Sequence, residues 1–275
     1  MTPTIPSLTM NDGKKIPQLG FGTYLVPPDD AERVVTQALE TGYRHIDTAA
    51  LYGNESEVGA AIAASGLKRD ELFVTTKLWN DDHQPDRARA AISASLEKLG
   101  LDHVDLYLIH WPAPVKYGDS YVAAWDAFQE FKREGLATSI GVSNFNIEHL
   151  DKLRGETPAV DQVELHPSFA QVPLRAELAR RGITVESWAP LGRGADLTDP
   201  VIAQIAAEVG HTPAQVVIRW HMQSGLVVIP KSVTPSRIAE NFDVFGFELT
   251  DSQMQAIDAL DCGNRRGNDP VTADF

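Results

Sequence analysis

The sequence is poor in cysteine, because Cys262 is the only one among 275 residues. A lone cysteine forms no disulfide within the chain, which fits a reducing cytoplasm. No apolar run is long enough to span a membrane, and residues 1–10 have neither the basic start nor the apolar core of a signal peptide. We therefore expect a cytoplasmic protein that works without a membrane partner.

Positive charge is also scarce: 24 Lys and Arg residues stand against 38 Asp and Glu residues, giving a net charge of −14. A surface this acidic repels nucleic acid, so an anionic ligand must be held by a local basic pocket. Metal-ligand spacings such as HxH and HExxH are missing around His83, His110 and His166, so we expect no metal site.

The glycine-rich motifs of nucleotide-binding sheets are missing as well. Gly20 and Gly22 have no third glycine at the Rossmann spacing, and no GxxxxGK[ST] segment occurs. What the chain does contain is an Asp12-Gly13 hairpin signal, followed by strand segments that alternate with amphipathic helices. This alternation predicts an α/β protein with a (β/α)8 TIM barrel, an N-terminal β-hairpin and extra C-terminal helices. A doubly wound sheet is the alternative, and the missing fingerprint disfavours it.

No change of composition divides the chain, so we expect a single barrel domain over residues 1–275. The expected strands cover residues 19–23, 43–48, 72–78, 104–109, 136–142, 160–165, 183–188 and 226–229. Helices are expected from residue 29 to the glycine at 42, from 54 or 55, and over 85–99, 121–133, 147–153, 173–181, 200–209 and 213–224, with two more beginning near 235 and 250.

Polar residues stand at the carboxyl ends of these strands, which meet on one face of a barrel. Asp47 ends the second strand, Lys77 the third and His110 the fourth. Taken singly, each has a structural alternative, as a helix cap, a solvent-exposed amine or a satisfied buried imidazole. Because a lone buried amine or carboxylate is costly, we expect Asp47 and Lys77 to pair.

Tyr52 lies in the loop five residues beyond Asp47. A phenol is a weak acid at neutral pH because its pKa lies near 10. A nearby ammonium lowers that pKa, so we expect Lys77 to make Tyr52 a proton donor while Asp47 holds the amine. His110 can bond the oxygen that Tyr52 protonates. Such a site lacks only a source of electrons.

A basic helix start follows the eighth strand. Lys231 and Ser232 precede a helix that Thr234 caps, and Arg237 lies in its first turn. Backbone N–H groups and two cations at a helix start predict an anion site, with a solvated basic helix start as the alternative. Trp188, at the end of the seventh strand, can stack on a flat ring or pack at the barrel rim.

Several segments resemble the motifs of the aldo-keto reductase superfamily, in order and over nearly the whole chain. They are GYRHIDTAALYGNESEVG, TTKLW, LIHWP, GVSNF and IPKSVTPSRIAEN. With LYLIHWP and ESWAPLG, the sequence is most similar to the bacterial 2,5-diketo-D-gluconate reductase-like branch. This resemblance implies a monomeric barrel that binds NADPH across its open face and reduces carbonyl compounds. It also implies the catalytic tetrad Asp47, Tyr52, Lys77 and His110.

The resemblance implies a cofactor site along the same face. By motif, the nicotinamide carboxamide is held by Ser143, Asn144 and Gln162. Trp188 stacks on the nicotinamide ring, at a position where many relatives have tyrosine. The loop along the pyrophosphate contains Pro190, Leu191 and Gly192. The contacts to the 2′-phosphate match Lys231, Ser232, Thr234 and Arg237, and the contacts to adenine match Glu240 and Asn241. The remaining cofactor contacts match Gly22, Thr23 and Val233. Two cations at the 2′-phosphate favour NADPH over NADH.

The substrate pocket is implied in the same way, with Tyr24, Trp79, His110 and Trp111 lining it. The segment after Trp111 is short, and so is the segment that follows Leu260, which suggests small polar substrates such as dicarbonyls and keto-sugars. In that last segment, Arg265 and Arg266 contact either an anionic substrate or solvent, and we favour solvent.

Two other functions stay open at this stage. A lysine at a barrel strand end can form a Schiff base with a carbonyl, so Lys77 could serve a lyase. Asp47 argues against this, because an ion-paired lysine keeps its proton. A non-catalytic nucleotide-sensing protein, like the channel-associated relatives of the superfamily, is the second alternative, and the intact tetrad argues against it.

Overall fold

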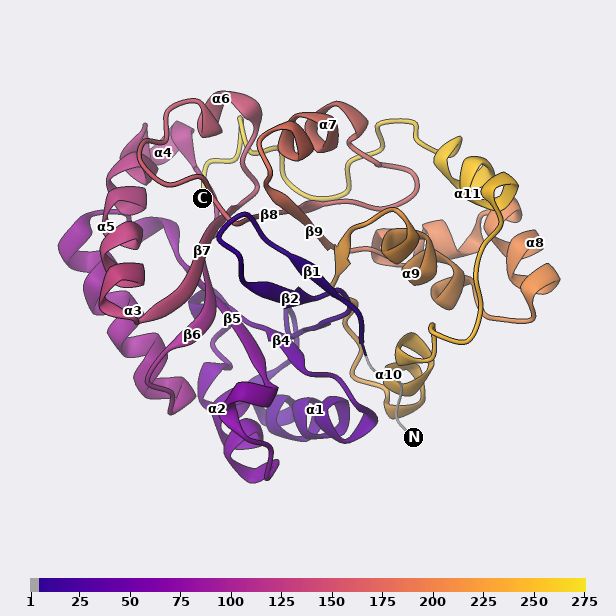
Figure 1. Ribbon diagram of the computed structural model, residues 1–275, viewed down its shortest axis with the longest axis horizontal. Helices are drawn as coiled ribbons and strands as arrows, with labels where there is room; N and C mark the ends of the chain where they lie inside the picture. Colours follow the sequence, from indigo (N-terminus) through magenta and orange to yellow (C-terminus); the bar gives the residue numbers. More distant parts are fainter. Residues whose placement is uncertain (1–4) are drawn as a thin grey trace.

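The computed structural model describes residues 5–275. Eight parallel strands form one sheet in the order β3-β4-β5-β6-β7-β8-β9-β10, with the helices outside it (Figure 1). The sheet closes on itself where β10 meets the segment before β3: the Val228 N–H donates to the Gln18 carbonyl and the Gly20 N–H to the Val228 carbonyl, both at 2.9 Å. The predicted (β/α)8 barrel is confirmed.

The elements alternate along the chain as expected. The strands are β1 (Ser7–Thr9), β2 (Lys15–Pro17), β3 (Phe21–Gly22), β4 (His45–Asp47), β5 (Phe73–Leu78), β6 (Val104–Ile109), β7 (Ala137–Ser143), β8 (Val160–Glu164), β9 (Thr184–Trp188) and β10 (Val227–Val228). The helices are α1 (Pro28–Thr41), α2 (Glu55–Ala64), α3 (Pro85–Leu99), α4 (Pro114–Tyr117), α5 (Ser120–Glu134), α6 (Ile147–Leu150), α7 (Val172–Arg180), α8 (Pro200–Val209), α9 (Pro213–Gln223), α10 (Pro235–Phe242) and α11 (Asp251–Asp258).

Every barrel strand lies within two residues of its expected bounds, because the apolar runs that predicted the strands are buried. The elements that the sequence did not predict are short. They are the four-residue helix α4 and the single 3-10 turns η1 (Ala50–Tyr52), η2 (Arg69–Glu71), η3 (Asn80–Asp82), η4 (Gly192–Gly194) and η5 (Asp196–Thr198). One turn is too short to leave a periodic pattern.

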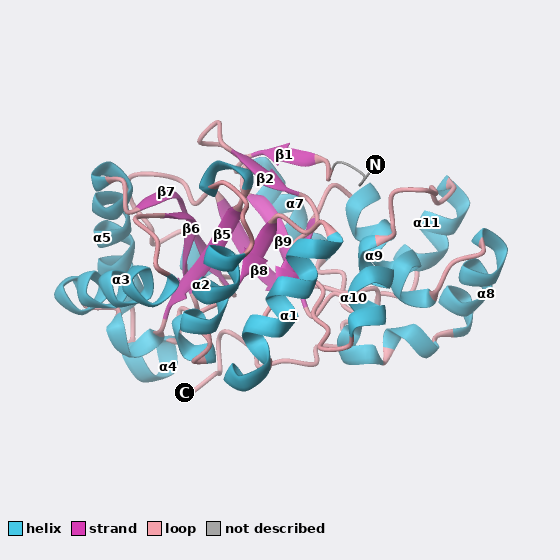
Figure 2. Ribbon diagram, turned by 90° about the horizontal axis from the view of Figure 1, so that it is seen from below, coloured by secondary structure: helices cyan, strands magenta, loops and turns pink. Residues whose placement is uncertain are grey.

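The hairpin predicted from Asp12-Gly13 pairs β1 with β2 in antiparallel register. It covers one end of the barrel, and the chain reaches its C terminus at the other end (Figure 2). Ile16 of β2 is fully buried against the barrel floor, and the Asn11 side chain donates to the Pro158 carbonyl at 2.8 Å. The hairpin therefore closes the amino-terminal end of the barrel and leaves the carboxyl ends of the strands for the site.

The helices follow the sequence pattern closely. Helix α1 buries the predicted apolar face and ends at Gly42, whose φ of 127° favours glycine. Helix α11 begins with the predicted capping box: the Gln253 N–H donates to the Thr250 hydroxyl at 3.3 Å, and the Thr250 N–H donates to the Gln253 side chain at 3.0 Å. Within residues 5–275, no helix has the length and apolar character needed to cross a bilayer.

Candidate active site

The centre of the site is an ion pair between neighbouring strands. Lys77, on β5, donates to Oδ1 of Asp47, on β4, at 2.6 Å and to the Thr48 carbonyl at 2.8 Å. Lys77 is fully buried and Asp47 is 2% exposed. The predicted pairing is confirmed, and it compensates the cost of burying both charges.

Tyr52 ends the turn η1 beside this pair, with Nζ of Lys77 3.4 Å from its hydroxyl oxygen. Burial raises the pKa of Tyr52 well above its usual value of 10, and the negative charge of Asp47 raises it further. The expected net lowering of this pKa is wrong, because burial and the charge of Asp47 outweigh the stabilisation that the Lys77 ammonium gives the phenolate. The lysine charge is largely satisfied by Asp47 at 2.6 Å, so it does not offset the desolvation of a phenolate. The phenol therefore keeps its proton throughout the neutral range.

His110 follows β6, and its ring meets the edge of the Tyr52 ring at a centroid distance of 5.6 Å. Burial lowers the pKa of His110 well below 6.5, and the charge of Lys77 lowers it further. The imidazole is therefore neutral. A neutral ring next to a phenol hydroxyl can offer a hydrogen bond to an oxygen without competing for its proton.

A second layer of polar groups adjoins this pair, and of its members only Gln162 has a role predicted from the sequence. Gln162, on β8, donates through Nε2 to Oδ2 of Asp47 and to Oε2 of Glu186, both at 2.8 Å. Burial, followed by the charge of Asp47, raises the pKa of Glu186 to about 8. His45 lies 3.6 Å away through Nε2, and burial lowers its pKa to about 3, so it is neutral. An acid in the middle of the short strand β9 was the sequence signal for this layer.

The residues matched to the carboxamide gather on the far side of His110. Asn144 has a left-handed backbone with φ of 63°, and its side chain donates to the His110 carbonyl at 3.0 Å and to the Ser143 hydroxyl at 3.0 Å. Trp188 donates its indole N–H to Oδ1 of Asn144 at 2.8 Å. The Ser143 hydroxyl donates to the Gln162 carbonyl at 2.7 Å. These bonds fix the orientation of the Trp188 ring at the end of β9.

The basic helix start lies at the beginning of α10 as expected. Lys231, Thr234 and Arg237 are exposed, whereas Ser232 is buried and accepts the Thr234 N–H at 3.1 Å. The Thr234 hydroxyl makes no capping bond to the helix, so the first turn keeps N–H groups for a ligand. Two exposed cations at such a turn fit a phosphate dianion.

The other residues matched to the cofactor occupy the rim around this helix. Thr23 donates through its N–H and its hydroxyl to the Asp47 carbonyl, both at 3.0 Å. At Gly22, a Cβ would stand 3.1 Å from the Ile229 carbonyl. Asn241 is buried, Val233 is exposed, and Glu240 accepts a hydrogen bond from the Thr212 hydroxyl. The segment from β9 into η4 contains Pro190, Leu191 and Gly192.

Three aromatic side chains form a wall beside the tetrad. Phe275 stacks on Trp79 with ring centroids 5.7 Å apart and meets the edge of Trp111 at 5.1 Å. Trp79 in turn contacts the His110 ring at 5.3 Å, and Tyr24 contacts Tyr52 at 5.1 Å. Trp79, Trp111 and Tyr24 were predicted to line a substrate pocket, and Phe275 was missed because it stands in no motif.

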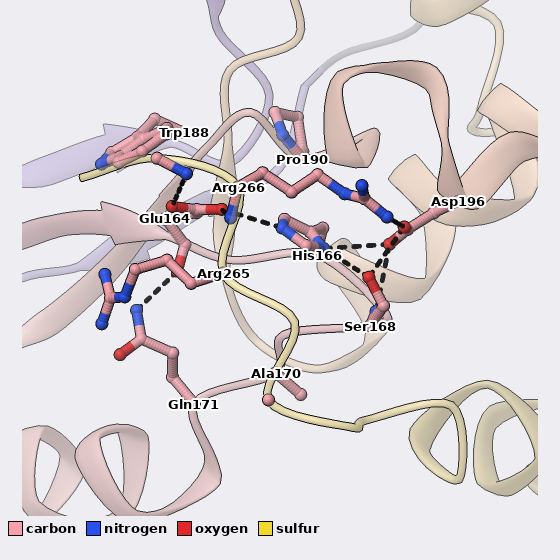
Figure 3. Close-up of polar contacts among 12 residues, drawn as sticks. Glu164, His166, Ser168, Ala170, Gln171, Trp188, Pro190, Asp196, Arg265 and Arg266 are labelled. Atoms are coloured by element: carbon pink, nitrogen blue, oxygen red, sulfur yellow. Dashed lines mark hydrogen bonds and ion pairs between the residues drawn. The ribbon is translucent and has the colours of Figure 1, made fainter. Parts of the chain in front are cut away.

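A hydrogen-bonded cluster holds the last segment of the chain against the barrel (Figure 3). The Glu164 carboxylate accepts the backbone N–H groups of Arg266 at 2.6 Å and Gly267 at 2.8 Å. His166 lies between Oε1 of Glu164 at 3.1 Å and Oδ2 of Asp196 at 3.0 Å. Burial opposes the charged form of His166, but its bonds to both carboxylates outweigh this and raise its pKa. We call these five residues the tail cluster.

The expectation that Arg265 and Arg266 contact solvent holds only in part, since both side chains also contact the protein. Arg266 donates through Nη2 to Oδ1 of Asp196 at 3.2 Å, and the Arg265 guanidinium lies 4.6 Å over the centre of the Phe169 ring. Both arginines are partly buried, since the carboxylates of the tail cluster draw the segment inward. In the part of the chain that the structure describes, no three His, Cys, Asp or Glu side chains are arranged to hold a metal ion.

Gly267 packs directly on the indole of Trp188. A Cβ at Gly267 would stand 2.4 Å from the Trp188 ring and 2.7 Å from Oε2 of Glu164. The tail cluster thus ends at a residue that must be glycine for the segment to reach the ring.

The tail cluster gives a testable expectation. Glu164→Gln removes the charge that accepts two backbone N–H groups, and charge-assisted bonds of this kind contribute about 1.5–3 kcal/mol each. We expect faster amide exchange at Arg266 and Gly267 and faster proteolysis of residues 263–275. The matched control is Glu177→Gln, which breaks the pairs of Glu177 with Arg180 and Arg181, away from the last segment of the chain, and should leave both measurements unchanged. Unchanged amide exchange in Glu164→Gln would contradict the role of Glu164 in holding residues 266 and 267 against the barrel.

Comparison with known proteins agrees with this geometry. The sequence model of the Aldo/keto reductase family matches residues 18–261. An aldo-keto reductase from Mycolicibacterium smegmatis is 53% identical over 273 residues, covering 98% of each chain. Methylglyoxal reductase DkgA from Escherichia coli is 50% identical over 273 residues, covering 98% of this chain and 97% of the relative.

Solved structures give the same result. The apo form of Gox0644 superposes with a TM-score of 0.95 at 47% identity, over 99% of this chain and 100% of that one. A mutant of Gox0644 in complex with NADPH superposes with a TM-score of 0.95 at 46% identity, over the same shares of the two chains.

Proposed function

Since the chain belongs to the aldo/keto reductase family, we propose that it reduces small aldehydes and ketones, dicarbonyls in particular, to alcohols with NADPH, and that Tyr52 supplies the proton. The observation that carries this proposal is the buried Asp47–Lys77 pair, whose ammonium lies 3.4 Å from the Tyr52 hydroxyl. The relative named methylglyoxal reductase supports a small dicarbonyl as substrate. We further propose that the chain acts as one barrel domain and as a monomer.

The residues present fit NADPH. Lys231 and Arg237 are exposed cations at the open first turn of α10, where a 2′-phosphate would be neutralised. Gly22 leaves room beside the Ile229 carbonyl that a side chain would fill, and Trp188 offers a flat ring fixed by Asn144. When bound, NADPH supplies the hydride that the carbonyl carbon receives.

The remaining chemistry belongs to this chain. Tyr52 donates its hydroxyl proton to the carbonyl oxygen, so that hydride and proton together convert the carbonyl to an alcohol. Lys77 donates toward the tyrosine oxygen and stabilises the charge left on it, while Asp47 keeps the ammonium in place. The neutral imidazole of His110 hydrogen-bonds the carbonyl oxygen and orients it toward Tyr52.

The substrate class can be tested with a panel that contains methylglyoxal, phenylglyoxal, diketo-sugar acids, simple aldehydes and a steroid ketone. We expect the dicarbonyls to give the highest kcat/KM and the steroid the lowest, because Trp79, Trp111 and Phe275 wall the site closely. The measurement is NADPH consumption with purified protein. A protein that binds NADPH but oxidises it with no member of the panel would favour the nucleotide-sensing alternative.

Cofactor choice gives a second expectation. Lys231→Ala and Arg237→Ala each remove one cation from the start of α10, and a charged hydrogen bond contributes about 1.5–3 kcal/mol. We expect each variant to raise the Kd for NADPH about tenfold or more and to leave the Kd for NADH nearly unchanged. Lys14→Ala, an exposed lysine in the hairpin turn at the other end of the barrel, is the control. Equal losses for both dinucleotides would contradict the assignment of the phosphate.

The lyase alternative is less well supported. Schiff-base formation needs a neutral amine with a free lone pair, and Lys77 donates to Asp47 and to Thr48 in a fully buried position. Borohydride trapping of a substrate adduct on Lys77 would revive it.

A further inference from the structure

Glu186 is a buried acid that the proposed reaction does not use. It stands on β9 in register with Gln162 on β8, so the two side chains enter the barrel side by side. Nε2 of Gln162 donates to Oε2 of Glu186 and to Oδ2 of Asp47, each at 2.8 Å. Gln162 is 2% exposed and Glu186 is fully buried. A chain of hydrogen bonds therefore crosses the barrel from β9 to β8, β4 and β5.

This chain of hydrogen bonds fixes which end of the Gln162 amide faces Asp47 and Glu186. A side-chain amide has two N–H donors at one end and an acceptor oxygen at the other, and the two ends have nearly the same shape. Both N–H groups are committed to carboxyl oxygens of Asp47 and Glu186. Among residues 5–275, no hydrogen bond reaches the amide oxygen of Gln162. The oxygen is thus left for a donor from outside the chain.

We propose that Glu186 is a positioning residue of the cofactor site: together with Asp47 it holds the Gln162 amide so that its oxygen accepts from the carboxamide N–H of nicotinamide. This inference rests on the proposed function, since it takes Gln162 as a cofactor contact. Without Glu186, Asp47 alone occupies one N–H and leaves the second without a buried partner. The amide is then free to turn.

The charges around Glu186 agree with such a role. The titratable groups near it are Asp47, Lys77, Tyr52 and His45, of which His45 is neutral and 3.6 Å away. No cation lies within bonding distance of Glu186 among the described residues, so it does not serve as half of an ion pair. In either protonation state one carboxyl oxygen can accept from Gln162, because a proton held on Oε1 leaves Oε2 free.

The test compares two dinucleotides by isothermal titration calorimetry. NADP⁺ carries the carboxamide, whereas its 3-acetylpyridine analogue has a methyl group in place of the NH₂ and offers no donor. Wild-type protein should bind NADP⁺ about tenfold more tightly than the analogue, the size expected for one hydrogen bond. Glu186→Thr, which fits a strand but cannot reach Gln162, should lose most of this preference through weaker NADP⁺ binding alone. Glu186→Gln, which keeps an acceptor oxygen, should restore it.

Ser187→Ala is the matched control, because Ser187 is the next buried residue of β9 and makes no hydrogen bond through its hydroxyl. It should keep the wild-type preference. An unchanged preference in Glu186→Thr, or equal loss of affinity for both dinucleotides, would overturn the inference. If Glu186→Thr does not fold, the wild-type protein still tests the inference, because equal affinity of the wild type for NADP⁺ and for the analogue would also overturn it. Wild-type protein that binds neither dinucleotide would instead refute the proposed function.

Discussion

Replacing Tyr52 by phenylalanine is expected to lower kcat about 10²–10⁴-fold, the usual contribution of a positioned general acid. The change removes one oxygen and keeps the ring, which packs against Tyr24 and His110. The Kd for NADPH should therefore stay close to the wild-type value. Stopped-flow reduction of methylglyoxal and fluorescence titration of NADPH separate the two effects.

Tyr107→Phe is the matched control for this variant. Tyr107 is also buried, and its hydroxyl has no hydrogen-bond partner among residues 5–275, but its ring stacks on Phe128 outside the barrel. The same loss of oxygen there should leave kcat unchanged. Substantial turnover by Tyr52→Phe, at normal NADPH affinity, would remove Tyr52 from its proposed role.

Replacing Lys77 by methionine should have two large effects. It removes the hydrogen-bonded ammonium from the Tyr52 oxygen, so turnover should be lost. It also leaves Asp47 buried without its cation, and removing one partner of a buried pair costs about 3–5 kcal/mol of the free energy of unfolding. Urea unfolding with the cofactor absent measures the second effect, and NADPH consumption measures the first.

The double variant Asp47→Asn with Lys77→Met distinguishes stability from catalysis. It removes both charges, so the free energy of unfolding should recover most of the loss seen in Lys77→Met. Turnover should stay abolished, because no ammonium faces the Tyr52 oxygen. A double variant that regains activity along with stability would show that Lys77 acts only as part of the scaffold.

The parts of the site that could be predicted from the sequence are those that follow from strand topology. Asp47, Lys77 and His110 end consecutive parallel strands, so a barrel brings them to one face whatever the loops do. Lys231 and Arg237 were predicted for a similar reason, since the start of a helix after the last strand lies on the same rim. The positions of these two side chains could be predicted without knowing any contact between distant parts of the chain.

Other features depend on tertiary packing and left no local pattern. The direction of the Tyr52 pKa shift depends on how fully the phenol is buried and on whether the charge of Asp47 or that of Lys77 has the larger effect. Neither quantity can be predicted from the spacing of residues in the sequence. Glu186 lies between Val185 and Ser187 in β9, and its contact with Gln162 becomes evident only once β8 and β9 are in register. Phe275 and Arg266 reach the site through a segment with no helix or strand period.

The contact between Gly267 and the Trp188 ring sets a rule for engineering this protein. Exchanging residues 268–275 should allow a redesigner to widen or narrow the aromatic wall, because these residues carry Phe275 but not the bonds to Glu164. Position 267 itself tolerates no larger residue, since any β-carbon would meet the indole. Libraries that randomise the segment are best anchored at this glycine and varied only beyond it.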